Sequence, residues 1–138
     1  MRRSWYAAAL LTLACETSGG LQPSLNHLQP SLNQPFSLRV GETAEFAKPK
    51  LSVTFRAVSE DSRCPSDVVC VWEGNGQVRL EIRLRGSRQT LALNTTTQPR
   101  EVSVGSYRLR LDELAPLPEA TRPIPPTEYV ATLELQAK

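Results

Sequence analysis

Two of the three cysteines, Cys64 and Cys70, lie close together in a polar segment, residues 60–74. Strand-like segments flank this polar segment on both sides. A disulfide bond between the two cysteines would therefore close a short loop at the edge of a β-sheet. Closing so short a loop contributes only about 2–3 kcal/mol in the chain-entropy model. We therefore predict that the bond serves mainly to fix a turn that has little apolar material of its own.

The first 14 residues have the pattern of a signal peptide. Arg2 and Arg3 precede an apolar run that is too short to span a bilayer. The run ends at Ala14-Cys15, which resembles the lipobox of bacterial lipoproteins, although Thr12 stands where leucine is usual. We predict that Cys15 is acylated; ordinary cleavage that leaves a free thiol is the alternative. Acylation accounts for the odd cysteine and leaves Cys64 and Cys70 to pair in an oxidising compartment.

Residues 15–35 contain a tandem heptapeptide, Leu21–His27 followed by Leu28–Gln34. A proline in each copy excludes a coiled coil, because proline breaks a helix interior. The composition favours a flexible, partly polyproline spacer. The predicted organisation is thus a signal peptide over residues 1–14, an anchor cysteine and spacer over 15–35, and a folded domain over 36–138.

From Phe36 onward, apolar and polar residues alternate in short segments separated by turn residues. This period of two is typical of half-buried strands. We predict an all-β fold, an antiparallel β-sandwich of immunoglobulin-like or small barrel-like form with about eight or nine strands and one disulfide. The final strand is expected to pair centrally. The segments that alternate most clearly are 36–40, 51–57, 77–85, 107–111 and 129–136.

Three finer predictions concern the segments between these strands. Residues 68–72 are apolar and are expected to form a short strand, with Trp72 packed beside the disulfide. Asn75-Gly76 is a strong signal for a hairpin turn. Residues 114–126 contain five prolines and are expected to form a long, rigid loop.

The cysteine segment resembles a motif of small exported or lipoprotein-like bacterial proteins of uncharacterised function. The resemblance rests on Asp61-Ser62-Arg63-Cys64-Pro65, Val68, Cys70-Val71-Trp72 and Gly74, and it extends to the segments 107–111 and 124–126. It covers most of residues 36–138. It implies a β domain outside the cytoplasm and no particular activity.

Acidic side chains surround the two cysteines and suggest a candidate Ca²⁺ site. Ca²⁺ takes six to eight oxygen ligands, and Asp61, Asp67 and Glu73 could supply carboxylates from a rigid loop. The alternative is that Asp61 accepts hydrogen bonds from loop amides or from Arg63. A zinc or copper site is disfavoured, because the single histidine, His27, falls in the predicted spacer.

Catalysis is difficult to build from this sequence. No histidine lies in the predicted domain, which excludes Ser-His-Asp and Cys-His arrangements. A small hydrolase with a carboxylate pair is a third hypothesis, and its candidate residues are Asp61, Asp67, Glu73, Asp112 and Glu113. A sandwich of about 100 residues with short loops offers little room for a substrate cleft. We therefore predict that the protein is not an enzyme.

The charge balance argues against a nucleic-acid partner. The chain has 16 basic and 14 acidic residues, and Arg2 and Arg3 lie in the predicted signal peptide, so the rest carries no net charge. Arginines that point outward from residues 79–85 and 108–110 would form a basic stripe only if those strands were neighbours. We predict a non-enzymatic binding or structural domain of the cell envelope, with a protein or glycan partner that uses loops 60–74 and 114–127.

Overall fold

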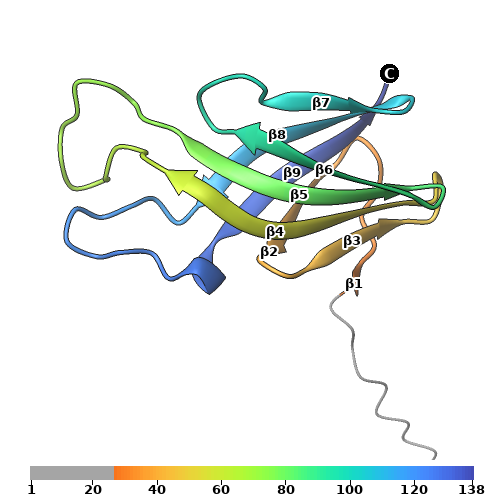
Figure 1. Ribbon diagram of the computed structural model, residues 1–138, viewed down its shortest axis with the longest axis horizontal. Coiled ribbons are helices and arrows are strands. Elements are labelled where there is room, and N and C mark those ends of the chain that lie inside the picture. Colours follow the sequence, from red (N-terminus) through yellow and green to blue (C-terminus); the bar gives the residue numbers. More distant parts are fainter. Residues whose placement is uncertain (1–26) are drawn as a thin grey trace, which may run out of the picture.

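A computed structural model describes residues 27–138, which form two packed β-sheets (Figure 1). The first sheet has the order β1-β3-β4-β5-β6 and the second the order β2-β9-β8-β7. The first sheet contains β1 (His27–Leu28), β3 (Thr43–Phe46), β4 (Leu51–Asp61), β5 (Gly76–Leu84) and β6 (Ser87–Asn94). The second contains β2 (Pro35–Arg39), β7 (Glu101–Val104), β8 (Tyr107–Ala115) and β9 (Val130–Ala137).

Neighbouring strands are antiparallel, except that the two-residue β1 runs parallel to β3. The predicted all-β sandwich with one disulfide is therefore confirmed. The final strand lies between β2 and β8, so its predicted central position is also confirmed. A short 3₁₀ helix, η1 (Pro126–Glu128), ends the long proline-rich segment.

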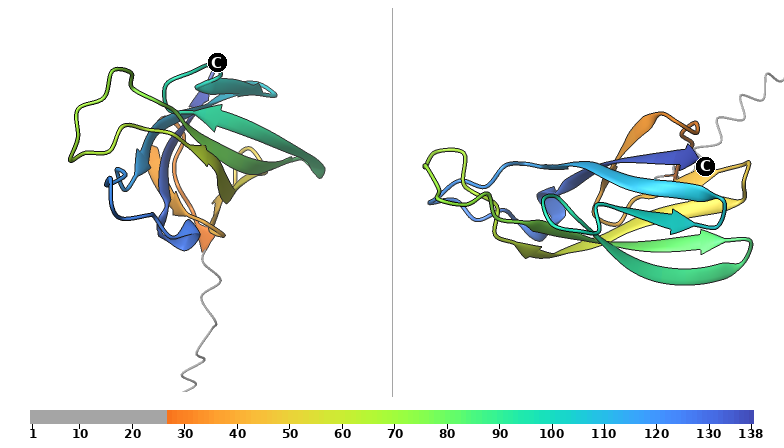
Figure 2. Two further views of the ribbon diagram at one scale, coloured as in Figure 1. Left: turned by 60° about the vertical axis from the view of Figure 1, so that its left-hand side comes forward. Right: turned by 90° about the horizontal axis from the view of Figure 1, so that it is seen from above.

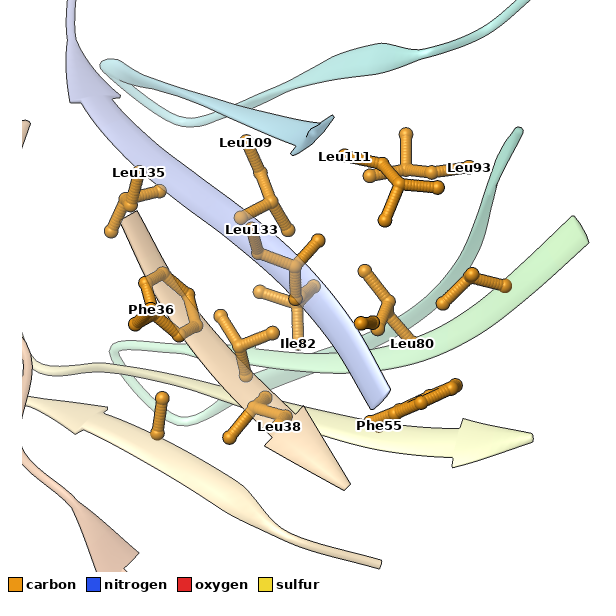
Figure 3. Close-up of a cluster of buried hydrophobic side chains, with 14 of the residues drawn as sticks. Phe36, Leu38, Phe55, Leu80, Ile82, Leu93, Leu109, Leu111, Leu133 and Leu135 are labelled. Atoms are coloured by element: carbon orange, nitrogen blue, oxygen red, sulfur yellow. The ribbon is translucent and has the colours of Figure 1, made fainter. Parts of the chain in front are cut away.

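The core lies between the inner faces of the two sheets (Figure 3). Phe55, Leu80 and Ile82 from the first sheet face Leu109 and Leu133 from the second, and all are inaccessible or almost inaccessible to solvent. Each comes from a segment in which apolar residues alternate with polar ones. Burial of such side chains stabilises the fold by about 25 cal/mol per Å² of apolar surface.

The folded part begins earlier than we predicted. β1 pairs with β3, and the amide of Asn33 donates to the carbonyl oxygen of Leu135 at 2.8 Å. The Asn33 side-chain oxygen accepts from the amide of Ala137 at 3.2 Å, and Leu32 packs against the core. Residues 27–35 thus belong to the sandwich rather than to a flexible spacer. Cys15 and residues 15–26 lie outside the described residues.

Two local predictions were wrong. Residues 68–72 form no strand, because the segment is looped back by the disulfide and has no neighbouring strand to pair with. Asn75-Gly76 is not a hairpin turn either, since Gly76 is already the first residue of β5. Instead, the Asn75 side chain donates to the side-chain oxygen of Asn94 at 2.9 Å.

The strands on which a basic stripe would have depended are not neighbours. Residues 79–85 lie on and just after β5, whereas residues 108–110 lie on β8, and these strands belong to different sheets. Arg110 is instead paired with Asp112 at 2.6 Å and with Glu134 at 2.8 Å.

Candidate functional site

Two long loops project beyond the same end of the sandwich (Figures 1 and 2). The first, residues 62–75, joins β4 to β5 and contains the disulfide. The second, residues 116–129, joins β8 to β9 and includes η1. Because each loop starts and ends at a core strand, the sandwich fixes both of their bases.

A buried ion pair lies at the base of the first loop. The Arg63 guanidinium donates from Nε to Asp61 Oδ1 and from Nη2 to Asp61 Oδ2, both at 2.7 Å. The side chain of Arg63 is 8% exposed and that of Asp61 is 11% exposed. This two-pronged geometry suits the planar guanidinium and gives the strongest type of side-chain hydrogen bonding.

The same arginine connects the two loops. Its Nη1 donates to the carbonyl oxygen of Leu114, and its Nη2 donates to the carbonyl oxygen of Pro116 at 2.9 Å. Asp61 in turn accepts a hydrogen bond from the Tyr129 hydroxyl at 3.0 Å. Arg63 and Asp61 therefore join the end of β4 to the end of β8 and to the start of β9.

These contacts shift two ionisation equilibria. Burial alone would raise the pKa of Asp61, but the hydrogen bonds and charge of Arg63, with the Tyr129 hydroxyl, outweigh it and hold this pKa below its usual value. Burial raises the pKa of Tyr129, and its hydrogen bond to the Asp61 carboxylate adds to that shift. Asp61 is thus an ionised structural acceptor at neutral pH.

Two glycines allow the loop to return close to its own start. Gly74 has a φ of +70°, and a Cβ there would lie 1.8 Å from the carbonyl oxygen of Ser62. A Cβ on Gly76 would approach Leu114 Cδ2 at 2.9 Å and the Arg63 side chain at 3.2 Å. No other residue fits these positions without moving the backbone or the arginine.

The outer part of the first loop is closed by the predicted disulfide and bonded to the second loop. Cys64 and Cys70 are joined, with their Cα atoms 5.9 Å apart. The Ser66 amide donates to the carbonyl oxygen of Pro118 at 2.8 Å, and the Asp67 carboxylate accepts from the Ala120 amide at 2.9 Å. The two loops therefore form one connected unit.

Exposed apolar side chains lie on both loops of this unit. Val69 is 100% exposed, Val71 91% and Trp72 80%, and Leu117 on the second loop is 62% exposed. We call Val68, Val69, Val71, Trp72 and Leu117 the apolar tip. The prediction that Trp72 packs beside the disulfide in the core was therefore wrong.

The predicted Ca²⁺ ligands do not converge. The Asp61 carboxylate is engaged by Arg63 and Tyr129, and Asp67 is engaged by the Ala120 amide, while Glu73 is exposed. Within residues 27–138, no group of three or more histidine, cysteine, aspartate or glutamate side chains is placed to hold a metal ion. The alternative role for Asp61, as an acceptor for Arg63, is the one the structure shows.

The two remaining carboxylates considered for a hydrolase lie on β8 rather than on the first loop. Asp112 is paired with Arg110, and Glu113 is exposed on β8. A hollow of about 110 Å³ lies within the second loop, where Arg122 pairs with Glu128 at 3.7 Å, and it contains none of the predicted carboxylates.

Comparison with known proteins gives no match to a family model, a curated protein or a solved structure. The resemblance of the cysteine motif to exported bacterial proteins therefore stays a prediction. Among the described residues, no helix is long and apolar enough to cross a membrane.

Two features of the site were not predicted from the sequence: the connecting role of Arg63 and the exposure of the tip. Tyr129 lies 68 positions from Asp61, so local patterns contain no sign of this contact. A signal for exposure existed in Pro65 and the short spacing of the cysteines, which together leave residues 66–69 no room for a paired strand.

Proposed function

We propose that the domain is a non-enzymatic binding module of the cell envelope and that the apolar tip is its contact surface. The observation that supports this most directly is the exposure of Val69, Val71 and Trp72 on a loop held by a disulfide and by its partner loop. Clustered apolar side chains with a polar surround are typical of interaction sites. Tryptophan is also enriched among residues that contribute most to binding.

The charges around the apolar tip favour a protein partner. Asp67, Glu73 and Glu119 are exposed on the two loops, and Glu60 is exposed near the end of β4. This acidic rim would be repelled by anionic lipid or nucleic acid, and it would complement a protein pocket lined by apolar residues and edged with lysine or arginine. We therefore favour a protein over a glycan as the ligand of this end.

The predicted signal peptide and the acylation of Cys15 support the envelope location. An acyl chain on Cys15 would tether the domain through residues 16–26, whose extended reach is at most about 40 Å. The domain would then act close to the membrane surface. The proposal assigns no catalytic role to Asp61, Asp67 or Asp112, because Asp61 and Asp112 are paired with arginines and Asp67 accepts from the Ala120 amide.

Site-specific photo-crosslinking in the cells that make the protein tests this proposal. A photoreactive phenylalanine analogue replaces Val71 in the full-length chain, and Thr90, exposed on β6, is the matched control position. We expect a discrete protein adduct from position 71 and none from position 90. Adding Trp72→Ser to the position-71 variant should abolish the adduct.

Two results would contradict the proposal. One is the absence of any adduct from position 71 when the protein is present at its normal level and is oxidised. The other is an adduct whose yield does not change with Trp72→Ser, which would indicate random collision rather than a contact made by the tip.

A further inference from the structure

The end of the sandwich opposite the apolar tip carries a cluster of basic side chains. Strand β4 runs from Leu51 at this end to Asp61 at the loop base, a length of about 35 Å for an extended strand. The turns after β3, β5 and β7 gather here (Figure 1). We call the following residues the basic end: Lys48, Lys50, Arg83, Arg85, Arg88 and Arg108.

Specific contacts hold the three turns together. The Arg85 amide donates to the carbonyl oxygen of Lys50 at 3.1 Å, which joins the β5–β6 turn to the β3–β4 turn. Arg83 lies opposite Arg88 across the β5–β6 pair. The β7–β8 turn of the other sheet lies alongside, because a Cβ on Gly105 would be 2.9 Å from the Leu84 side chain.

Half of these cations have no carboxylate partner among residues 27–138. Arg83 and Arg88 share Glu81, at 3.2 and 3.5 Å, and Arg108 pairs with Glu101 at 3.4 Å. Lys48, Lys50 and Arg85 are exposed, and no residue in 27–138 forms an ion pair with them. Lys50, Arg83 and Arg85 also line an open hollow of about 480 Å³ that Glu45 borders.

The opposite end has the opposite charge. Exposed carboxylates there are Glu60, Asp67, Glu73, Glu113 and Glu119. Of the two arginines within the loops, Arg63 is paired with Asp61 and Arg122 with Glu128, and Arg39 at the end of β2 adds a third positive charge at this end. A chain with almost balanced charge is therefore strongly polarised along its longest direction. Such polarity orients a molecule in the field of a charged surface.

We propose that the basic end binds the surface of an anionic lipid bilayer and so directs the apolar tip away from the membrane. Lysine and arginine near an anionic bilayer are attracted by its surface potential, whereas the acidic end is repelled. An acyl anchor on Cys15 would hold the chain at the membrane without orienting the domain, and attraction between the basic end and an anionic bilayer would supply that orientation. The membrane setting rests on the proposed envelope location, but the lipid affinity does not depend on acylation or on a partner at the tip.

Nucleic acid is a less suitable ligand for this surface. Proteins that bind single strands combine cations with aromatic side chains on which bases stack. The basic end contains no exposed aromatic residue within the described chain, and Trp72 lies at the opposite end. Cations at the ends of two sheets without an exposed aromatic side chain suit the headgroups of a lipid surface better.

Cosedimentation with vesicles tests the proposal. The probe is residues 15–138 with Cys15→Ser, which lacks the predicted signal peptide and cannot be acylated, mixed with vesicles of phosphatidylcholine alone or with one-third phosphatidylglycerol. We expect binding only to the anionic vesicles, and the binding should weaken as salt is added. Lys48→Gln, Lys50→Gln and Arg85→Gln together should lower the partition coefficient by about a hundredfold, from roughly 1 kcal/mol per cation.

A second triple variant is the matched control. Arg39→Gln, Arg100→Gln and Arg122→Gln remove the same charge from exposed sites elsewhere, so this variant should bind anionic vesicles within about threefold of the parent. Thermal melts of both triple variants serve as the check that each is folded. Equal losses in the two variants, equal binding to neutral vesicles, or preferential binding to duplex DNA would overturn the proposal. None of these results depends on crosslinking at position 71, so the two proposals fail separately.

Discussion

At the scale of single residues, Arg63 has the largest share in holding the loop end together. It is the one buried arginine among residues 27–138, and its guanidinium donates to Asp61, to the carbonyl oxygen of Leu114 at the end of β8 and to that of Pro116 in the second loop. Burying a charged pair is costly in itself. Within this network each buried charge has its partners, so removing one member exposes the full cost of the other.

Replacing Arg63 should therefore destabilise the fold severely. Arg63→Met removes four donated hydrogen bonds and leaves the buried Asp61 carboxylate without its counter-charge. We expect a loss of about 3 kcal/mol or more in the free energy of unfolding, measured by urea denaturation. Arg63→Lys, which keeps the charge but not the planar fork, should recover part of the loss. A loss below about 1 kcal/mol for Arg63→Met would contradict this role.

The lowered pKa of Asp61 predicts a loss of stability in acid. Asp61 binds its proton less readily in the folded chain than in the unfolded chain, where its pKa has the ordinary value of 3.8. The carboxylate therefore stabilises the fold above that value, and this contribution is lost as the pH falls through the lower folded pKa. Melts from pH 7 to pH 3 should show a steeper decline for the parent than for Asp61→Asn. The variant should still lose some stability in acid, because a hydrogen bond from Arg56, as the largest cause, holds the pKa of Glu81 below its usual value. An identical dependence of Tm on pH in the parent and the variant would exclude the assigned role of Asp61.

At the scale of elements, the strands could be predicted from the sequence and the loops could not. In a strand such as β5, apolar and polar residues alternate because every second side chain points into the core, so the strand can be recognised from its own sequence. Residues 68–72 are equally apolar, but whether they form a strand depends on a neighbour with free hydrogen-bonding groups. The disulfide and the turn at Pro65 keep residues 68–72 away from any neighbouring strand. Apolar composition alone therefore predicted the wrong secondary structure for this segment and the wrong environment for Trp72.

The start of the domain was misplaced for a related reason. Leu28 to Gln34 repeats the preceding heptapeptide, and its proline suggested a spacer. What fixes this segment is a set of contacts to the last strand, about 100 positions away in sequence. Its one local signal is Asn33, which has a φ of +59°, a conformation that asparagine tolerates better than most residues.

Asn33→Ala should therefore destabilise the domain. It removes the side-chain acceptor for the Ala137 amide and places alanine in the left-handed region. We expect a loss of roughly 1–2 kcal/mol in unfolding free energy, from one hydrogen bond and the backbone strain together. Asn33→Gly, which relieves the strain but not the lost bond, should lose less. Unchanged stability for Asn33→Ala would place the start of the folded domain after this residue.

The exposure of Trp72 can be read from its fluorescence. In a full-length chain with Trp5→Phe, Trp72 is the sole tryptophan. Because it is 80% exposed, its emission in the folded protein should match that of the urea-unfolded chain, and acrylamide should quench both equally. Trp72→Ser should change the unfolding free energy by less than about 0.5 kcal/mol, as for other surface positions. A blue shift on folding would show that the ring is buried.

At the scale of the whole molecule, the sandwich separates two surfaces of different chemistry. The core occupies the middle, the connected loops lie at one end, and the basic turns lie at the other (Figure 1). The disulfide and Arg63 hold the loops as a unit. A rigid scaffold of this kind can present one end to a membrane and the other to a partner.

Thermal melting of the full-length oxidised chain tests whether the folded protein binds Ca²⁺. A ligand at a hundred times its dissociation constant would stabilise the folded state by about 2.7 kcal/mol. For a domain of this size that corresponds to a rise of roughly 10 °C in Tm. Because Asp61 is committed to Arg63 and Asp67 to the second loop, we expect millimolar Ca²⁺ and EDTA to give the same Tm.

The matched comparison uses Asp61→Asn and Asp67→Asn together. This double variant should melt at a lower temperature than the parent, because it weakens the Arg63 pair and the bond to Ala120. Its Tm should be just as insensitive to calcium. A calcium-dependent rise in the parent that disappears in the double variant would instead make the 60–74 loop a cation site, and the ion pair with Arg63 would then have to open when calcium binds.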